Sequence, residues 1–534
     1  MTFFCKMDMF GTLYPEHISR TYYHRQKGHI FTVTIGGFEM TNYFVDMLSP
    51  EEQKVIYYVP TFADFLRKVE KDFPDKPATT DGSITYSFKE LVSRVAKRRA
   101  VLASKGVKPG DKVGVMARND LDAMEWFLAV PSFGAILTML PVQLGAEQIT
   151  GISMKFGFSA LVIADEFKEL AANVNCNIIS TKEISEEEAA YGDVKKESVA
   201  CIYFTGGTTG APKGVILTHG AMMRGALNGT YQPGGIFDHR VMVILPMSHI
   251  FGSIMGFLSV LYTGSTVIAC TDMRAAVGQI PVLRPTFLVL VPGLVEVILG
   301  IAKMKGKGFL GDLRKMIVGA APVPPRLIKD AADLGIKLFP GYGLTEGANL
   351  TSANIDIESK PESMGKIYPE QEVKVVDGEL WIKGDNVMLG YAGNPEETAR
   401  VMEDGWLKTG DLVRFDEEGF LYITGRIKNL IILSNGENVS PEELEDNFYK
   451  DPRVKDALVR EMQVGGNTVI GVEILPLEPA VAGLSDEEIQ AQMEKLTEDI
   501  NAKLPSYMKV AKVVVRKEDF PRTGAMKIDR NKVH

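Results

Sequence analysis

The sequence predicts an α/β protein in which a large N-terminal domain with mostly parallel sheets precedes a small α+β domain. Three observations predict it: short apolar runs alternate with helical stretches, this rhythm changes after about residue 370, and segments beyond Arg426 become shorter and more charged. The 534 residues would fill three to four domain-sized units at roughly 150 residues each. We therefore expect a large domain over 1–427 and a small domain over 428–534.

Composition places the chain among ordinary globular proteins. Apolar residues make up 45% and charged residues 24%, which excludes disordered and collagen-like chains. The formal net charge of −9 argues against a nucleic-acid partner, because phosphate backbones attract basic surfaces. Cys5, Cys176, Cys201 and Cys270 form no CxxC pair, which argues against a zinc knuckle and a disulfide framework. A reducing, cytoplasmic compartment is expected.

Two segments bear on membrane association. The first residues reach the charge of Lys6 before an apolar stretch can form, so no signal peptide is expected. Residues 241–270 contain no Asp, Glu, Lys or Arg, but prolines and glycines interrupt them. This punctuation predicts a strand, a turn, a helix and a strand rather than an integral membrane segment.

Residues 1–58 are rich in Tyr, Phe and Met and are expected to be irregular.

The elements of the large domain follow from local signals. Ser87 and Glu90 form a capping box that predicts a helix, and Gly106 is expected to end it. Apolar runs between helical stretches predict buried, largely parallel strands. These runs are 113–116, 160–164, 241–245, 266–269, 287–291 and 316–318.

Different signals appear after about residue 370. Two short apolar runs flank Asp377-Gly378, a pair that favours positive φ and predicts a hairpin over 373–382. Ser440-Pro441-Glu442-Glu443 predicts a helix start with a cap and a proline at the first position. Ser485 and Glu488 predict another helix start. These elements belong to the expected α+β part of the chain.

The strongest chemical motif lies in residues 203–214. Its four glycines let the backbone approach a ligand closely, its three threonines supply hydroxyl groups, and Lys213 adds a positive charge. These features suit a polyphosphate. The loop lacks the Gly-Lys-Ser/Thr ending of a Walker A motif, and the alternative is a flexible surface turn.

This loop resembles the phosphate loop of the adenylate-forming superfamily, which includes acyl-CoA synthetases, adenylation domains and luciferases. Six further segments resemble motifs of this superfamily and stand in its order, over a span from about residue 60 to the end. They are Gly319-Ala320-Ala321-Pro322, 341–346, 406–411, 425–429, 434–439 and 521–528.

The resemblance implies a fold and a reaction. The large domain would contain a distorted β-barrel portion, and the small domain would be mobile. The protein would be an AMP-forming carboxylate–CoA ligase, which joins an acid to ATP and then passes the acyl group to CoA. A ligase that loads an acyl-carrier protein and a non-catalytic acyl or nucleotide sensor are the alternatives. The protein could be a monomer or a homodimer.

The resemblance also implies the residues that bind ATP and CoA. Phosphate contacts would come from Thr205, Gly206, Gly207, Thr208, Thr209, Gly210 and Lys213. Adenine and α-phosphate contacts would come from Gly319, Ala320, Ala321, Gly341, Tyr342 and Gly343. Asp411 and Arg426 would hold the ribose, Lys428 would serve as the interdomain hinge, and Gly436 would flank the path of the thiol.

Catalytic roles are implied for Thr345, Glu346, His249 and Lys527. Glu346 and Thr208 would be the protein ligands of Mg²⁺, which prefers oxygen ligands and retains water. Lys527 would shield the charges that meet when a carboxylate attacks ATP. Two departures from the superfamily pattern stand beside these positions, Met526 next to Lys527 and Asn429 after the hinge.

The substrate is expected to be a fatty or aryl acid. His249 lies in an apolar segment, where it is either a hydrogen-bonded core histidine or the gate to the acyl site that the resemblance implies. Amino-acid-activating relatives tend to place an Asp in this region, and this chain has none there, which argues against an amino-acid substrate.

Overall fold

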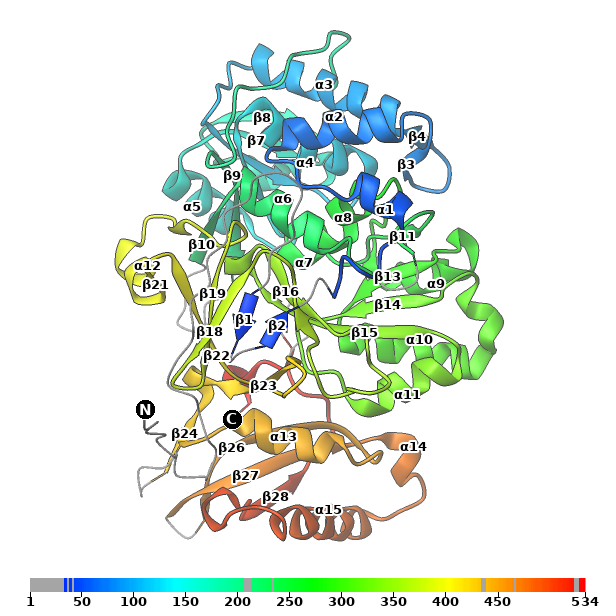
Figure 1. The fold of residues 1–534 in the computed structure, drawn as a ribbon, viewed down its shortest axis with the longest axis vertical. Helices are drawn as coiled ribbons and strands as arrows, with labels where there is room; N and C mark the ends of the chain where they lie inside the picture. Colours follow the sequence, from blue (N-terminus) through cyan, green and yellow to red (C-terminus); the bar gives the residue numbers. More distant parts are fainter. Residues whose placement is uncertain are drawn as a thin grey trace.

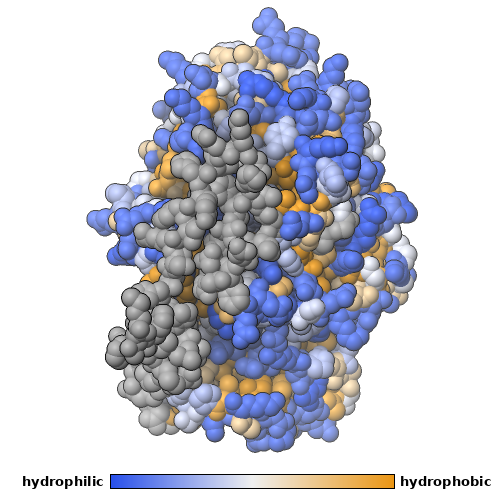
Figure 2. All heavy atoms as spheres, in the orientation of Figure 1, coloured by the Kyte–Doolittle hydropathy of each residue, from blue (hydrophilic) through white to orange (hydrophobic). Residues whose placement is uncertain are grey.

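The computed structural model describes residues 33–35, 38–40, 43–205, 213–232, 235–433, 438–464, 467–522 and 528–533. Figure 1 shows two bodies, a large upper one coloured blue to yellow and a small lower one coloured orange to red. Hydrophilic side chains dominate the coloured part of the face in Figure 2, with apolar residues between them. Among the described residues, no helix combines the length and the apolarity that a membrane crossing requires.

A seven-stranded sheet carries the residues on both sides of the predicted phosphate loop. Its order is β20-β10-β9-β6-β5-β7-β8. The strands are β5 (Lys112–Met116), β6 (Ile136–Met139), β7 (Phe158–Ile163), β8 (Asn177–Ser180), β9 (Val199–Thr205), β10 (Lys213–Thr218) and β20 (Gly390–Tyr391). Strands β5 to β9 pair in parallel, and β10 pairs antiparallel with both β9 and β20.

A nine-stranded sheet forms the second layer, in the order β17-β16-β15-β14-β13-β11-β12-β3-β4. Its central strands are parallel, as their apolar runs predict. The strands are β3 (Pro77–Thr80), β4 (Thr85–Ser87), β11 (Arg240–Met242), β12 (Thr266–Ile268), β13 (Phe287–Leu290), β14 (Lys315–Val318), β15 (Lys337–Leu344), β16 (Asn349–Ala353) and β17 (Lys366–Ile367).

Helices pack on these sheets, and all of them except α12 bury apolar side chains. The predicted capping box is present at α3, where Ser87 Oγ accepts from the Glu90 amide and Glu90 reaches back to the Ser87 amide. The helices are α2 (Phe62–Asp72), α3 (Phe88–Ser104), α4 (Leu121–Phe133), α5 (Ala146–Phe156), α6 (His219–Asn228), α9 (Met273–Leu283), α10 (Pro292–Lys305), α11 (Pro325–Asp333) and α12 (Pro395–Val401).

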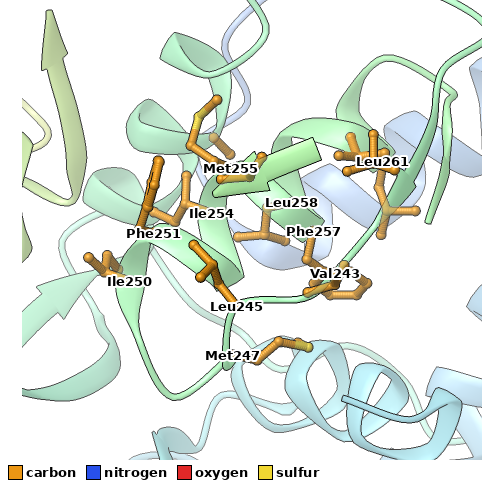
Figure 3. Packing of buried hydrophobic residues seen from close by; sticks show 14 of the residues in the cluster. Val243, Leu245, Met247, Ile250, Phe251, Ile254, Met255, Phe257, Leu258 and Leu261 are labelled. Atoms are coloured by element: carbon orange, nitrogen blue, oxygen red, sulfur yellow. The ribbon is translucent and has the colours of Figure 1, made fainter. Parts of the chain in front are cut away.

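The uncharged stretch 241–270 forms the predicted strand, turn, helix and strand. Between β11 and β12 it contains α7 (Ile250–Ser253), a π-helical turn (Ile254–Leu258) and α8 (Ser259–Tyr262). Figure 3 shows apolar side chains of this segment gathered in the core, including Phe251, Ile254 and Met255. The segment is buried because its apolar side chains pack in the core, where Ser253 also shares a hydrogen bond of 2.7 Å with Tyr203 of β9.

A third sheet is antiparallel and contains the predicted hairpin. Its strands are β18 (Glu372–Val376), β19 (Glu379–Lys383), β21 (Met402–Glu403), β22 (Trp406–Phe415) and β23 (Leu421–Arg426). Val376 pairs with Glu379, and both turn residues have positive φ, 49° at Asp377 and 82° at Gly378. Positive φ at both central positions matches the right-handed twist of the two strands.

The C-terminal part has a hydrophobic core of its own. Leu444, Phe448, Val472 and Met493 belong to a cluster that is separate from the large core of the preceding residues. The Ser440 and Ser485 caps open α13 and α15 as predicted. The elements are β24 (Ile431–Ile432), β25 (Asn438–Val439), α13 (Pro441–Tyr449), β26 (Val454–Val464), β27 (Asn467–Pro476), α14 (Glu478–Val481), α15 (Asp486–Asn501) and β28 (Lys512–Val515).

The prediction that residues 1–58 are irregular is wrong for the described part of that segment. Strands β1 (Val33–Ile35) and β2 (Phe38–Met40) form a hairpin, and helix α1 (Pro50–Val55) follows. Ser49 and Glu52 make a complete capping box with Pro50 at the first helical position. These three residues were a readable start signal for a helix.

Candidate functional site

Strands β9 and β10 hold the two ends of the predicted phosphate loop together. Thr205 is the last residue of β9, Lys213 is the first of β10, and the two are paired in register. The segment between them lies outside the described residues, and with it the predicted contacts Gly206, Gly207, Thr208, Thr209 and Gly210. The loop therefore connects two antiparallel strands, and the described residues fix both of its ends.

Among the described residues, the Lys213 ammonium contacts two side chains that lie beyond the predicted motif. Its Nζ lies 2.5 Å from Glu397 Oε1 of α12 and 5.0 Å from the ring centre of Tyr391. The hydrogen bond to Lys213 lowers the pKa of Glu397. Glu397 therefore neutralises the cation at the base of the loop.

The predicted adenine-binding residues lie at the carboxyl ends of neighbouring parallel strands. Gly319 follows β14 and Gly341 belongs to β15, and a Cβ atom on Gly319 would lie 3.2 Å from the Gly341 oxygen. The same Cβ atom would lie 3.2 Å from the ring of Phe251, so both glycine segments adjoin α7. Ala320 has a φ of 70°, a strained conformation that is typical of functional sites.

The Asp411 carboxylate has two partners, Arg426 and Tyr342. Arg426 is the residue that was predicted to hold the ribose together with Asp411. Asp411 is 1% exposed and lies opposite Arg426 in the β22–β23 ladder. Its carboxylate is 2.6 Å from Arg426 Nε and accepts a hydrogen bond of 2.7 Å from the Tyr342 hydroxyl. Burial and this carboxylate raise the pKa of Tyr342. Asp411, Arg426 and Tyr342, which were all predicted to contact the nucleotide, therefore lie together.

Glu346 stands in a short 3₁₀ turn, Thr345–Gly347, between β15 and β16. The Tyr391 hydroxyl donates to Glu346 Oε1 over 2.9 Å, and the Met388 amide donates to the Glu346 carbonyl over 2.8 Å. Burial and the Glu346 charge raise the pKa of Tyr391, so Tyr391 remains a donor. Because β20 pairs with β10, Tyr391 connects the carboxylate to the base of the phosphate loop.

The donor set around Glu346 fits Mg²⁺ bound mainly by phosphate and water. Within the described ranges, no group of three His, Cys, Asp or Glu side chains could hold a metal ion. A single partly buried carboxylate is what Mg²⁺ takes from a protein when substrate phosphates supply further oxygens. The second predicted ligand, Thr208, lies outside the described residues.

His249 is not a core histidine, so that interpretation is wrong. Its side chain is exposed at the N-terminus of α7, where Nδ1 accepts a hydrogen bond of 3.3 Å from the Phe251 amide. The ring caps a helix because it precedes the first turn. Its role as a gate stays a prediction.

The predicted hinge residue, Lys428, lies near the charges of Arg426 and Asp411. Lys428 lies in the 3₁₀ turn Ile427–Asn429, where desolvation of its ammonium group and the charges of Arg426 and Lys213 lower its pKa. Asn429 donates to the Glu442 carboxylate of α13, which ties the turn to the C-terminal part. Gly436, Met526 and Lys527 lie outside the described residues.

Sequence reasoning missed Tyr391 and Glu397. Both follow β19 by fewer than twenty residues, yet they contact Glu346 and Lys213, which lie far from β19 in the sequence. The pairing of β20 with β10 brings them there, and local patterning carries no signal for such a long-range contact.

Comparison with known proteins identifies the family. Residues 65–392 match the AMP-binding enzyme model, and residues 428–534 match the model of the AMP-binding enzyme C-terminal domain. A feruloyl-CoA synthase from an Amycolatopsis species is 29% identical over 86% of this chain and 96% of its own length. The 4-coumarate–CoA ligase-like protein 6 of Arabidopsis thaliana is 30% identical over 80% of this chain and 81% of its own.

Solved structures share the fold. An anthranilate CoA ligase in complex with anthranoyl-AMP has a TM-score of 0.78 at 20% identity and covers 89% of this chain and 96% of its own. The o-succinylbenzoate CoA synthetase of Bacillus subtilis, in complex with its acyl-adenylate, has a TM-score of 0.74 at 24% identity and covers 89% and 98%. These matches confirm the predicted fold class, and the chain belongs to the AMP-binding enzyme family.

Proposed function

We propose that this protein is an AMP-forming carboxylate–CoA ligase that activates a carboxylic acid with ATP and transfers the acyl group to CoA. The observation that carries the proposal is the convergence of three charged groups that different sheets position, since all three act electrostatically on Lys428. Asp411 is held by Arg426 and Tyr342, Glu346 by Tyr391, and Lys213 stands at the phosphate loop beside Tyr391. Curated relatives that cover most of the chain are CoA ligases by name, which supports the acid–thiol ligase class.

In the first step the acid attacks the α-phosphate of ATP, giving acyl-AMP and pyrophosphate. Asp411 accepts hydrogen bonds from the ribose, and Lys213 leaves Glu397 to bind phosphate oxygens. Glu346 would hold Mg²⁺, which would supply a shield for the phosphate charges. Lys527 shields the charge of the attacking carboxylate, and Thr345 offers a hydroxyl donor. The cations, Lys213, Lys527 and Mg²⁺ when bound, would reduce the repulsion between the carboxylate and the triphosphate.

In the second step the thiol of CoA attacks the acyl-adenylate, giving the thioester and AMP. The 428–534 unit turns about Lys428 so that the Gly436 segment replaces the Lys527 segment at the site. A pantetheine arm on an acyl-carrier protein would undergo the same chemistry. No relative named above is a carrier-protein ligase by name, and this favours free CoA.

Pyrophosphate release tests the proposal. The protein is incubated with ATP, Mg²⁺ and a panel of aryl and aliphatic acids, with and without CoA. Acid-dependent release that CoA stimulates, together with AMP formation, is the expected result. Release without stimulation by CoA would favour a carrier-protein acceptor. No release with any acid would favour the sensor alternative.

A further inference from the structure

The amino edge of the nine-stranded sheet lies at the opposite end of its strands from the candidate site. Strands β11, β13, β14 and β15 are parallel and begin at this edge, whereas Gly319 lies beyond the carboxyl end of β14. Helices α9 and α10, on the right-hand side of Figure 1, end at the amino edge because each returns the chain to the start of the next parallel strand. The edge therefore combines strand starts with helix ends.

Basic residues stand at three of these strand starts. The Thr286 amide donates to the Arg240 carbonyl over 2.9 Å, and the Arg314 amide donates to the Thr286 carbonyl over 3.1 Å. The Lys337 amide in turn donates to the Arg314 carbonyl over 2.9 Å. Arg240, Arg314 and Lys337 are exposed. Because neighbouring strands are about 4.8 Å apart, these three cations share a short stretch of one rim.

The end of α10 and the turn that follows it add two exposed lysines. Lys305 is the last residue of α10, and Lys307 begins the 3₁₀ turn Lys307–Leu310. Lys307 lies beside the strand starts, because a Cβ atom on Gly335 would be 2.6 Å from its Nζ and Gly335 precedes Lys337 by two residues. The five cations, which we call the amino-edge basic surface, are Arg240, Lys305, Lys307, Arg314 and Lys337.

The positive charge of this surface is not neutralised within the part of the chain that the structure describes. None of its five members has an ion-pair partner there, and the neighbouring carboxylates each have another cation. These pairs are Asp238 with Lys76, Asp312 with Arg284, Asp330 with Lys303 and Asp333 with Lys329. Burial, and after it the charges of Arg314 and Lys337, lower the pKa of Lys315 to about 8. The surface is therefore locally basic, although the whole chain carries a net charge of −9.

Exposed apolar side chains accompany the cations. Met304 of α10 is 80% exposed and Val282 of α9 is 76% exposed, the two highest values among the large apolar residues that the structure describes. Met304 immediately precedes Lys305, and the Leu283 carbonyl, next to Val282, accepts a hydrogen bond of 2.9 Å from the Arg240 guanidinium. Because water disfavours such side chains, their place beside unpaired cations indicates a partner that is both anionic and apolar.

An anionic lipid bilayer has both properties. Its headgroups attract Lys and Arg, and the boundary of its acyl chains accepts apolar side chains that protrude singly. A nucleic acid offers phosphate but no apolar layer, and the net charge of −9 opposes it. An acidic protein would need a pocket for each apolar anchor. The bilayer therefore fits this surface with the fewest further requirements.

We propose that the amino-edge basic surface binds an anionic lipid bilayer, with Met304 and Val282 entering the headgroup layer. The nine-stranded sheet then stands with its amino edge at the lipid and with its carboxyl edge, which carries the candidate site, away from it. The contact goes beyond the proposed ligase function and does not depend on it, since none of these residues has a proposed role in the reaction.

Vesicle cosedimentation of the intact chain tests the proposal. The vesicles consist of phosphatidylcholine alone or of phosphatidylcholine with phosphatidylglycerol, at low and at high salt. The variants are Lys305→Glu/Lys307→Glu, Arg314→Glu/Lys337→Glu and Met304→Ser. Lys503→Glu/Lys509→Glu is the matched control, because it makes the same charge change at two exposed lysines of the C-terminal part. Melting temperatures show which variants are folded, and the exposed positions Lys305, Lys307 and Met304 keep the test available if Arg314→Glu/Lys337→Glu is not.

The wild type should bind the vesicles that contain phosphatidylglycerol and lose this binding at high salt. Each double reversal in the surface should weaken binding by at least about 25-fold, because one cation near an anionic bilayer contributes about a factor of five. Met304→Ser should weaken binding by about tenfold, and the control should bind like the wild type. Absence of binding to either kind of vesicle, an equal loss in the control, or a preference for soluble polyglutamate over the vesicles would overturn the inference. Cosedimentation needs no turnover, so the result stands apart from the outcome for the ligase proposal.

Discussion

Replacing Tyr391 with Phe should weaken the use of Mg²⁺ in acyl-adenylate formation. The change removes one hydroxyl, which donates to Glu346 Oε1 over 2.9 Å, and keeps a ring that is 8% exposed and packed in the core. A hydrogen bond to a charged group contributes about 1.5–3 kcal/mol. Glu346 is only partly buried, so we take the lower value, which corresponds to about a tenfold effect.

The assay is the Mg²⁺ concentration that gives half-maximal ATP–pyrophosphate exchange. It should rise about tenfold in Tyr391→Phe, with the melting temperature nearly unchanged. Tyr422→Phe is the matched control, because Tyr422 donates to the Asp416 carboxylate over 3.2 Å in a part of the molecule without a proposed role in the reaction. An unchanged or lower Mg²⁺ requirement in Tyr391→Phe would refute the view that Tyr391 positions a metal ligand.

Three further predictions follow from other residues. Lys527→Ala should slow adenylation by about 10²–10³-fold and spare thioester formation from supplied acyl-AMP, and equal loss in both half-reactions would contradict its role. Lys428→Pro should leave acyl-AMP formation intact and slow the thioester step in single-turnover measurements, because proline fixes φ where the hinge must turn; a wild-type thioester rate would place the hinge elsewhere. Burial raises the pKa of Asp120 to about 6, above the value of about 4 in an unfolded chain, so its contribution to stability is lost as the pH rises through 6. Asp120→Asn should therefore gain stability over the wild type between pH 4 and pH 8, by roughly 2–3 kcal/mol, in urea denaturation, and a pH-independent difference would rule this out.

Local signals predicted the elements that local interactions determine. The caps at Ser87, Ser440 and Ser485 start helices because a side-chain oxygen accepts from a free backbone amide within three residues. The Asp377-Gly378 turn forms its hairpin for an equally local reason, the positive φ of both residues. The predictions of the α/β class and of the family were confirmed. Both rest on apolar runs and ordered motifs, which can be recognised in the sequence alone.

Long-range pairing was beyond sequence reasoning. Nothing near Tyr391 indicates that β20 joins the edge of the seven-stranded sheet and reaches Glu346. Helix α6 and strand β16 likewise meet although more than a hundred residues separate them, and each alone is an ordinary buried stretch in the sequence. His249 shows the reverse limit, because its apolar neighbourhood in sequence left a buried histidine open, whereas the residue is exposed and caps a helix.

The central claim is that this chain couples an acid to CoA through an acyl-adenylate. The most direct measurement follows oxygen from an acid labelled with ¹⁸O in its carboxylate, turned over with ATP and CoA and analysed by mass spectrometry. Attack of the carboxylate on the α-phosphate predicts one labelled oxygen in AMP and an unlabelled pyrophosphate. Label in inorganic phosphate with ADP as the nucleotide product, or unlabelled AMP, would contradict the account.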